Sequence, residues 1–507
     1  MTKSREEIAI KIQAFKRIFR QIMESRRSQV GIAIIIFFGI IAAIGPFFTT
    51  LDPVNAGSIH SFDELEAAEA NCVPEWYQGE KITHNVYPIP TPLFFNASQV
   101  SLWNVTEGVI IEYDQEFGYD QNGCVKITFQ EEGNATLSVN FYYPYQIPPK
   151  SFRGKYRYFI TANSNASKTE AKILILPSFK RYGLTAKSYR ASMPHFDYFT
   201  NEDMDKWKLV RNELISVNPN LKVWYERTYG KSPVDVIFNK PGNYSFELTI
   251  QFIGNASKVG NPTVYVDDVQ VIVYGNSFGL LGTDYLARDI FTQLVIGTRI
   301  SFIIGITAAT LSTIIGLFYG LISGYVGGIL DEIMMRINDM LLVIPGLPLL
   351  LVLVYVLGQS MLNIILVVGC LGWMGFARTV RSAVISLKEK LFIEAARAHG
   401  AGRFYIMRRH IIPNVFPLVY VTLAMGVPGA ILYEAAISWL GLAPLDVMSW
   451  GRMLYEFERS GSIATGALTK WYWVLPPGIC IAILSVAFVL LGYALDEILN
   501  PRLRETW

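Results

Sequence analysis

Six long apolar runs divide this sequence of 507 residues. A helix rises 1.5 Å per residue, so runs of this kind can cross a hydrocarbon core of ~30 Å. We therefore predict six membrane-spanning helices, over Val30–Phe48, Ile300–Ser323, Met340–Leu357, Leu362–Phe376, Val415–Ser438 and Tyr472–Leu495. The first run is expected to be a retained helix, because a long basic segment precedes it and it lacks a small-residue cleavage site.

A different pattern fills residues 51–278, between the first two runs. Short segments of alternating apolar and polar residues are bounded by turn residues, which is typical of strands. We predict strands at 125–129, 136–143, 155–163, 171–177, 244–253 and 263–275. This number of strands indicates a β-sandwich. Two of them resemble strands of jelly-roll, galactose-binding-like modules, so sugar binding is one hypothesis and a structural or partner-docking role is the other.

Glycosylation signals indicate on which side of the membrane this region lies. Six Asn-x-Ser/Thr sequons lie within it, more than its composition would produce by chance. They favour a glycosylated exterior face and, since common bacteria do not glycosylate so heavily, an archaeal source. The alternative is an exterior domain that merely uses Asn and Thr in turns. The candidate residues are Asn96, Asn104, Asn134, Asn165, Asn243 and Asn255.

The four cysteines divide into two pairs. Cys72 and Cys124 lie in the polar region, where an oxidising exterior would allow a disulfide between them. Two isolated free thiols are the alternative. Cys370 and Cys480 lie in apolar runs and are expected to be buried thiols.

The placement of basic residues orients the chain. Residues 1–28 and 377–414 each contain eight Lys or Arg, whereas 358–361 contain none and 439–471 contain three. By the positive-inside rule, both termini and the segment 377–414 are cytoplasmic, and residues 51–278 are extracellular. The expected organisation is a cytoplasmic basic segment (1–28), a first membrane helix (29–50), an extracytoplasmic β-rich domain (51–278) and a five-helix core (279–507) in the plasma membrane.

A polar segment between two apolar runs, Glu394–Asn414, has internal order. It contains the helix-forming stretch EAARAH, a glycine at Gly400, a second helical stretch and Pro413 as an expected stop. The positions of Ala396, Gly400 and Pro413 resemble the "EAA" loop of ABC importer permeases, with His410 similar to the peptide and nickel branch. A basic loop that matches by chance is the alternative.

The resemblance extends over two further stretches. Residues 280–301 keep Gly282, Asp284 and Arg288 of the segment that enters the second helix in dipeptide and oligopeptide permeases. Residues 432–454 resemble the exit of the fifth helix in that branch, and residues 491–504 resemble its C-terminal tail. It implies an all-α polytopic membrane protein with six transmembrane helices and the type I ABC importer permease fold, here with a large β-sandwich insert between helices 1 and 2.

The family implies the function and the partners. We expect a permease subunit that moves di- or oligopeptides delivered by an extracellular substrate-binding protein, paired with a second homologous permease subunit and two ATP-binding subunits. Oligosaccharides or nickel are alternative substrates. Within the coupling loop 379–414, the resemblance implies that Glu394, Ala395, Ala396, Gly400 and Pro413 dock the ATPase.

The sequence contains no complete nucleotide-binding motif. The stretch GSIATGALTK has the two glycines of a phosphate loop but Ala467 where the lysine should be. No zinc-site or serine-hydrolase motif occurs, so we expect no enzyme, no metal and no cofactor in this chain, with ATP and Mg²⁺ bound by partner subunits. A membrane-anchored extracellular binding protein is the alternative of a different class, and six spans argue against it.

Two residues inside the apolar runs are candidates for the translocation pathway. Glu434 is a carboxylate within a span, and such a group is expected to face the bundle interior. It could equally make a hydrogen bond that packs helices. Pro345 is expected to kink the third span.

Overall fold

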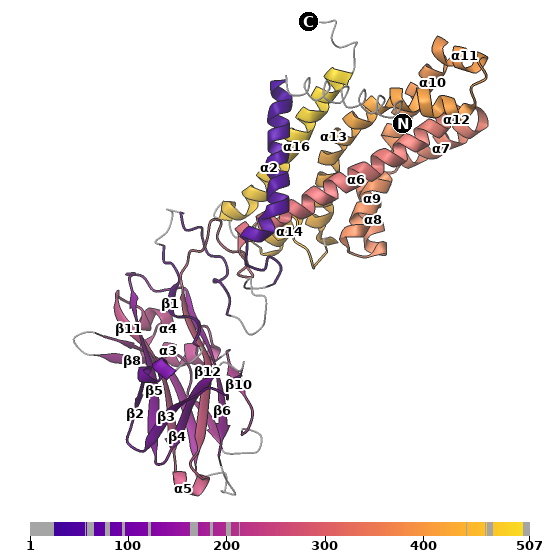
Figure 1. Cartoon of the computed structure of the whole chain (residues 1–507). Helices are drawn as coiled ribbons and strands as arrows, with labels where there is room; N and C mark the ends of the chain where they lie inside the picture. The colour runs from indigo at the N-terminus through magenta and orange to yellow at the C-terminus, as the bar shows by residue number, and fades with distance from the viewer. Residues whose placement is uncertain are drawn as a thin grey trace, which may run out of the picture. The chain divides into compact units, whose positions relative to one another are not determined.

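The computed structural model describes residues 25–55, 57, 65–76, 82–93, 97–119, 123–162, 171–182, 186–198, 204–211, 213–442, 444–461, 463 and 470–499. They form two compact units (Figure 1). One, mainly of β-strands, lies within residues 55–289, and the other is helical and combines the chain up to Val54 with the chain from Ile290 onward. Most of the predicted basic segment 1–28 lies outside the described residues.

The β unit consists of two antiparallel sheets of six described strands each. The first has the order β10-β6-β12-β4-β3 with β1 also on β12, and the second β2-β5-β11-β7-β8 with β9 also on β7. The strands of the first sheet are β1 (Val86–Leu93), β3 (Val109–Asp114), β4 (Cys124–Phe129), β6 (Ser151–Thr161), β10 (Lys208–Val210) and β12 (Thr263–Tyr274). Those of the second are β2 (Trp103–Val105), β5 (Gly133–Tyr143), β7 (Lys172–Arg181), β8 (Lys187–Arg190), β9 (His195–Tyr198) and β11 (Gly242–Ile253).

Alternating side chains of the two sheets form one apolar core. On β11, every second residue from Tyr244 to Phe252 is buried, which is the period that one face of a strand requires. Phe152 of the first sheet packs on Phe179 of the second, with ring centroids 5.0 Å apart. All six predicted strands are confirmed, as β4, β5, β6, β7, β11 and β12. Helices α3 (Pro219–Tyr229), α4 (Pro233–Ile237) and α5 (Ala256–Val259) complete this unit.

Of the two alternatives for Cys72 and Cys124, the disulfide is absent and the free thiols are present, since both thiols are free and buried. Cys124 begins β4, whose next residue pairs with Val266 of β12. Cys72 instead lies beside Gly275, with its Sγ 3.7 Å from the Gly275 carbonyl oxygen. Nine residues along a strand separate these two places by roughly 25–30 Å, whereas a disulfide requires Cα atoms within about 7 Å. Burial raises the pKa of the Cys72 thiol and raises that of Cys124 to about 12.

The helical unit contains several helices of membrane-spanning length. Within the described residues, five helices are long and apolar enough to cross a membrane, or up to six if one bent pair counts as a span. The described helices are α2 (Arg26–Phe48), α6 (Ile290–Val326), α7 (Gly328–Val343), α8 (Gly346–Leu357), α9 (Met361–Leu371), α10 (Met374–Lys388), α11 (Leu391–Ala398), α12 (Arg403–Ile406), α13 (Ile412–Ile437), α14 (Trp450–Arg459) and α16 (Trp471–Leu499).

The kink predicted at Pro345, within the span predicted over Met340–Leu357, is present. Helices α7 and α8 meet at 90°. The residue before a proline is disfavoured in the helical region, and Ile344 is accordingly extended (φ −69°, ψ 128°). Pro345 then caps the start of α8, so one apolar run forms two helices.

The glycines of α6 bring its backbone against α10. A Cβ atom added at Gly316 would lie 2.8 Å from the Trp373 carbonyl oxygen, and one at Gly324 would lie 2.9 Å from that of Arg381. At Gly320 the added atom would be closer still, to the Ala377 carbonyl oxygen. A spacing of four residues places these glycines on one helix face, as small-residue packing in membranes requires.

A polar clamp extends this contact beyond the glycines. Arg381 of α10 donates from Nε and Nη2 to the two carboxylate oxygens of Asp331 on α7, at 2.6 and 2.7 Å. Ser323 of α6 donates to the same carboxylate. Charge-assisted, two-pronged bonds of this kind are among the stronger side-chain bonds, so α6, α7 and α10 are joined where α6 ends.

Replacing Gly320 by Ala should destabilise the helical unit by about 1–3 kcal/mol, because the added methyl group collides with α10 backbone. The matched control is Gly375→Ala on α10, where no atom lies within 4 Å of the added carbon. Thermal unfolding in detergent measures both variants. Equal unfolding temperatures for the two would contradict the packing described here.

Alkylation tests the assignment of the two buried thiols in the β unit. Because burial keeps both thiols protonated at neutral pH, iodoacetamide should modify Cys72 and Cys124 only after unfolding. Peptide mass mapping of the native protein should recover each cysteine in a separate, unlinked peptide. Recovery of a Cys72–Cys124 linked peptide would show that the free thiols are misassigned.

Candidate functional site

The segment that follows α10 starts with α11, whose sequence explains both its helix and its end. Glu-Ala-Ala-Arg-Ala are strong helix formers, and the helix stops where Gly400 adopts φ +81°. The Gly400 N–H donates to the Arg397 carbonyl at 2.9 Å, and the Ala401 N–H donates to the Ala396 carbonyl at 3.0 Å. This pair of bonds is the Schellman motif, which requires a left-handed residue at the Gly400 position.

The chain then returns to the membrane helices through α12 and a wide turn. Residues Met407–Ile411 form a π-helical turn that leads directly into α13. Pro413 was expected to stop a helix here, and this is wrong, since it lies in the first turn of α13. A proline lacks the N–H that would bond to the preceding turn, and a π-helical turn is one of the few ways to pass it without a break.

Apolar side chains on both sides of the segment anchor it to the membrane helices. Ile393, Ile406 and Ile411 are buried together with Val380 and Val384 of α10. Ala396 and Ala401, the two ends of the Schellman bond, pack against the same cluster. The segment is therefore held on α10 and α13 rather than hanging free between them.

Large apolar side chains are exposed on the outer surface of the segment. Leu391 is 81% exposed, Phe404 74% and Tyr405 56%. Glu394 and Ala395 share the exposed face of α11 with Leu391. Large exposed apolar side chains are typical of a protein or membrane contact. We call residues Leu391–Asn414 the coupling segment, and its outer face consists of the exposed side chains of Leu391, Glu394, Ala395 and Tyr405.

Sequence reasoning found most of these residues but not all. It brought together Glu394, Ala395, Ala396 and Gly400, which lie on α11 and its terminating turn. It missed Leu391 and Phe392, because they precede the motif and read as the end of an apolar stretch. The helical spacing could have identified Leu391, because it places this residue one turn before Glu394 and Ala395 on the same helix face.

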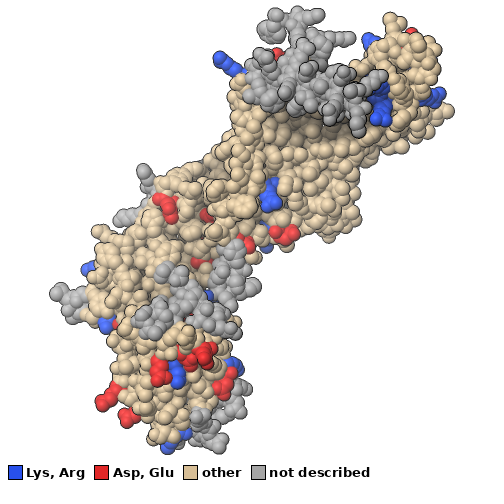
Figure 2. Space-filling model, in the orientation of Figure 1, with Lys and Arg blue, Asp and Glu red and all other residues tan. Residues whose placement is uncertain are grey.

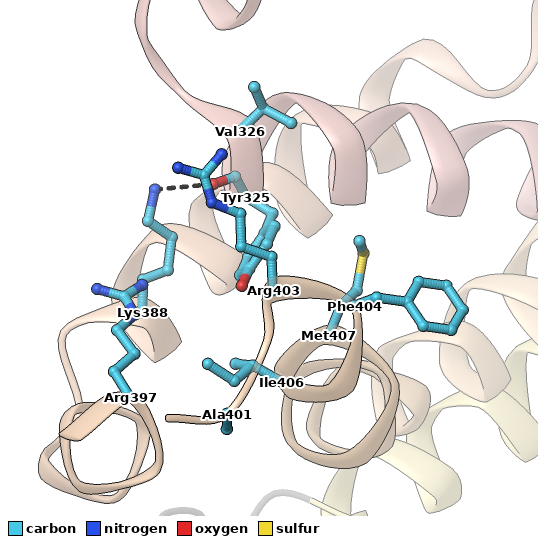
Figure 3. Close-up of a pocket in the computed structure, with 9 residues that line it drawn as sticks. All are labelled: Tyr325, Val326, Lys388, Arg397, Ala401, Arg403, Phe404, Ile406 and Met407. Carbon is cyan, nitrogen blue, oxygen red and sulfur yellow. Dashed lines mark hydrogen bonds between the residues drawn. The ribbon is translucent and has the colours of Figure 1, made fainter. Parts of the chain in front are cut away.

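A cavity of about 740 Å³ lies beside the coupling segment (Figure 3). Its lining combines three cations with apolar and aromatic side chains. The lining residues are Tyr325, Val326, Lys388, Arg397, Ala401, Arg403, Phe404, Ile406 and Met407. Basic side chains also appear on the surface at this end of the helical unit (Figure 2).

Lys388 connects the cavity to the end of a span. Its Nζ donates to the carbonyl oxygens of Tyr325 and Gly324, at 3.0 and 3.3 Å. These carbonyls belong to the last turn of α6, where backbone acceptors lack helical partners and the helix dipole is negative. The last residue of α10 therefore caps α6 immediately before the coupling segment begins.

Glu434, the intramembrane carboxylate, lies away from the coupling segment. It is 1% exposed, and its Oε1 accepts from Ser438 at 2.7 Å and from Ser449 at 2.6 Å. Within the described residues its Oε2 has no hydrogen-bond partner. The expectation that it faces the bundle interior is confirmed, and its visible contacts join α13 to the start of α14.

The sequons lie partly within the described residues. Asn104, Asn243 and Asn255 are exposed, and Asn134 is half-buried on β5. The Asn255 side chain also caps α5 by accepting from the Ser257 N–H at 3.1 Å. Asn96 and Asn165 lie outside the described residues. Glycosylation of these sites stays a prediction.

Sequence comparison finds relatives of the helical unit. Residues 312–505 match the family described as binding-protein-dependent transport system inner membrane component. The chain is 40% identical over 228 residues to the oligopeptide transport system permease OppC of Bacillus subtilis, covering 44% of this chain and 72% of that protein. It is 36% identical to the dipeptide permease DppC of B. subtilis, covering 44% of this chain and 68% of that protein. It is also 36% identical to the glutathione permease GsiD of Pectobacterium atrosepticum, covering 44% of this chain and 73% of that protein.

Structural comparison finds neighbours of both units at low similarity. A chain of the inward-facing MetNI methionine ABC transporter aligns with 19% identity and a TM-score of 0.32, covering 40% of this chain and 96% of that one. A carbohydrate-binding module of the β-sandwich superfamily aligns with 15% identity and a TM-score of 0.22, covering 41% and 64%.

Replacing Gly400 by Val should loosen α11, because a β-branched residue is strained at a φ of +81°. A cost of about 1–2 kcal/mol corresponds to amide exchange in α11 that is about 5- to 30-fold faster. Hydrogen-deuterium exchange of the full chain measures it. Gly402→Val is the control, since Gly402 has φ −67° and open space around it. Equal exchange in both variants would contradict the Schellman assignment.

Proposed function

The chain belongs to the family of oligopeptide and dipeptide transport system permeases, and from this we propose that its coupling segment docks an ATP-binding subunit that powers peptide import. Its relatives are permease subunits of peptide ABC importers, and so is this chain. The observation that carries the docking proposal is the outer face of the coupling segment, a set of exposed, mostly apolar side chains on a segment anchored to two spans. The finer assignments below rest on it.

In this proposal, the nucleotide that powers transport is bound by other subunits. Its sequence has no phosphate loop with the lysine and hydroxyl residue that bind nucleotide phosphates and Mg²⁺. ATP and Mg²⁺ are therefore bound by partner subunits in this proposal. A second homologous permease subunit, two ATP-binding subunits and an extracellular substrate-binding protein complete the importer.

The outer face is suited to docking in a cleft of the ATP-binding subunit. Leu391 and Tyr405 supply apolar anchors, and such anchors dominate the energetics of most interfaces. Ala395 is exposed and small, so a partner backbone can approach closely beside it. Glu394 is exposed on the same face and can pair with a basic group of the partner.

Movement of the docked segment would reach the membrane through two routes. The first is α10, which contacts α6 backbone to backbone along the glycine face. The second is α13, which continues from the π-helical turn. Closure of the nucleotide sites in the partner would thus rotate or tilt α10 and α13 together. Such a movement of the membrane helices would open the pathway to one side of the membrane and close it to the other.

The pathway residues are part of the same proposal. A cavity of about 200 Å³ between α6, α9 and α13 is lined by Ser312, Thr313, Thr422 and Tyr433 among other residues. Hydroxyl groups such as these can accept and donate hydrogen bonds to a peptide backbone. Glu434 and the break at Pro345 remain candidates for shaping this path, on the basis of burial and of the 90° bend.

The proposed orientation has both termini and the coupling segment in the cytoplasm and the β unit outside. The asymmetry of basic residues supports it. The β unit would then face the binding protein, with any glycans on its exposed asparagines. Six spans are proposed by counting the bent pair α7 and α8 as one span.

Leu391→Ser should weaken binding of the ATP-binding subunit by about 30-fold, the effect of losing an interface anchor worth about 2 kcal/mol. Because Leu391 is 81% exposed, the substitution should leave the fold intact. The control is Leu445→Ser, which removes a leucine that is 67% exposed outside the coupling segment. Co-purification of the ATP-binding subunit with each variant measures the effect.

Reconstituted uptake tests the function as a whole. Proteoliposomes that contain both permease subunits, the ATP-binding subunits and the binding protein should accumulate a labelled oligopeptide only with ATP, and the Leu391→Ser variant should lose this uptake. Undiminished uptake by that variant would contradict the docking assignment. Accumulation of an oligosaccharide or of nickel in place of peptide would contradict the substrate assignment and leave the docking assignment standing.

A further inference from the structure

We propose that the cavity beside the coupling segment binds the headgroup of an anionic phospholipid. This is a property beyond peptide transport, and it does not depend on which substrate the importer carries. It requires only that α6 and α10 span the membrane, because the cavity lies at their ends.

The position of the cavity matches the depth of a lipid headgroup. Tyr325 and Val326 are the last two residues of α6, and Lys388 is the last residue of α10. Both helices are parts of candidate spans. The predicted span Ile300–Ser323 ends just before Tyr325, so a cavity at this end of α6 opens near the level of the headgroups.

The charge of the cavity selects an anion. Lys388, Arg397 and Arg403 line it, and no carboxylate is among its lining residues. The Lys388 Nζ already donates to carbonyl oxygens at the end of α6. Within the described part of the chain, Arg397 and Arg403 form no recorded ion pair, which leaves two exposed guanidinium groups for a ligand. Guanidinium groups bind phosphate oxygens in pairs, and basic pockets between helices at a cytoplasmic membrane surface suit lipid headgroups.

The apolar part of the lining favours a lipid over a free anion. Val326 is 54% exposed and Phe404 74%, and both contribute to the cavity. Figure 3 shows Phe404 pointing away from the three cations. A free phosphate would gain nothing from these side chains, whereas the glycerol and upper acyl chain of a phospholipid would cover them. The volume of about 740 Å³ accommodates a headgroup.

The geometry of α11 separates this cavity from the proposed docking face. At 100° per residue, Arg397 lies about 120° around the helix from Leu391, on the flank next to the buried Ile393. Leu391 and Ala395 lie about 120° and about 160° from Arg397 around the helix, whereas Glu394 lies about 60° from it, between the two sides. A lipid in the cavity would therefore brace the coupling segment from behind, between α6 and the α11–α12 turn, while the partner binds in front.

The test uses the full-length chain in nanodiscs of phosphatidylcholine with and without phosphatidylglycerol. Native mass spectrometry then counts the phosphatidylglycerol molecules that stay bound to the protein after its release from the nanodisc. Arg397→Gln/Arg403→Gln should retain about 30-fold less than the wild-type chain, the effect of two basic groups at a membrane surface. Arg397→Lys/Arg403→Lys should keep most of the retention, and so should Arg336→Gln, whose guanidinium is 73% exposed on α7.

Three results would overturn the proposal. One is equal phosphatidylglycerol retention by the wild-type and glutamine-substituted chains. Another is displacement of the lipid by millimolar inorganic phosphate, which would indicate a site for a free anion. The third is loss of the ATP-binding subunit from the glutamine variant in nanodiscs of phosphatidylcholine alone, which would assign the two arginines to carboxylates of the partner. Lipid retention is measured on this chain without its partners, so failure of the docking proposal would not affect it.

Discussion

The close approach of α6 to α10 is the contact on which the helical unit depends. With glycine at three successive turns of α6, no side chain separates the two backbones, and added atoms at these positions would meet carbonyl groups of α10. The Asp331–Arg381 clamp and the Lys388 cap continue this contact to the ends of both helices. The start of the coupling segment is consequently fixed to a membrane helix. When α11 is displaced, α10 must move too, and it either slides along α6 or carries α6 with it.

The spacing of the motif in the coupling segment has a physical explanation in the turn that ends α11. Ala396 provides the carbonyl that the Ala401 N–H reaches, and only a residue tolerant of the left-handed region can stand between them at Gly400. The distance between Ala396 and Gly400 in the sequence is therefore set by the hydrogen bonds of the turn. The same turn packs the half-buried Ala396 and Ala401 against the apolar cluster and leaves Glu394 and Ala395 exposed, which separates the anchoring side of the segment from its outer face.

Much of the fold could be predicted from the sequence, because periodic burial leaves a local signal. The strands of the β unit and the glycine face of α6 follow directly from periods of two and four residues. Properties that depend on distant parts of the chain could not be predicted. Cys72 and Cys124 share a polar region but lie at opposite ends of β12, and Pro413 begins a helix because a π-helical turn precedes it. The break at Pro345 was foreseen as a kink, whereas its 90° angle was not. The cavity is invisible in the sequence, since its cations come from α10, α11 and α12.

The central claim is that the outer face of α11 contacts an ATP-binding subunit in the assembled importer. The most direct measurement is cross-linking from Ala395→Cys, an exposed position between the proposed anchors, with a photoactivatable maleimide in the complete complex. We predict a cross-link from this position to the ATP-binding subunit, and a change in its yield when ATP is added. Cross-links from Ala395→Cys only to lipid or to the second permease subunit, with or without ATP, would contradict the claim.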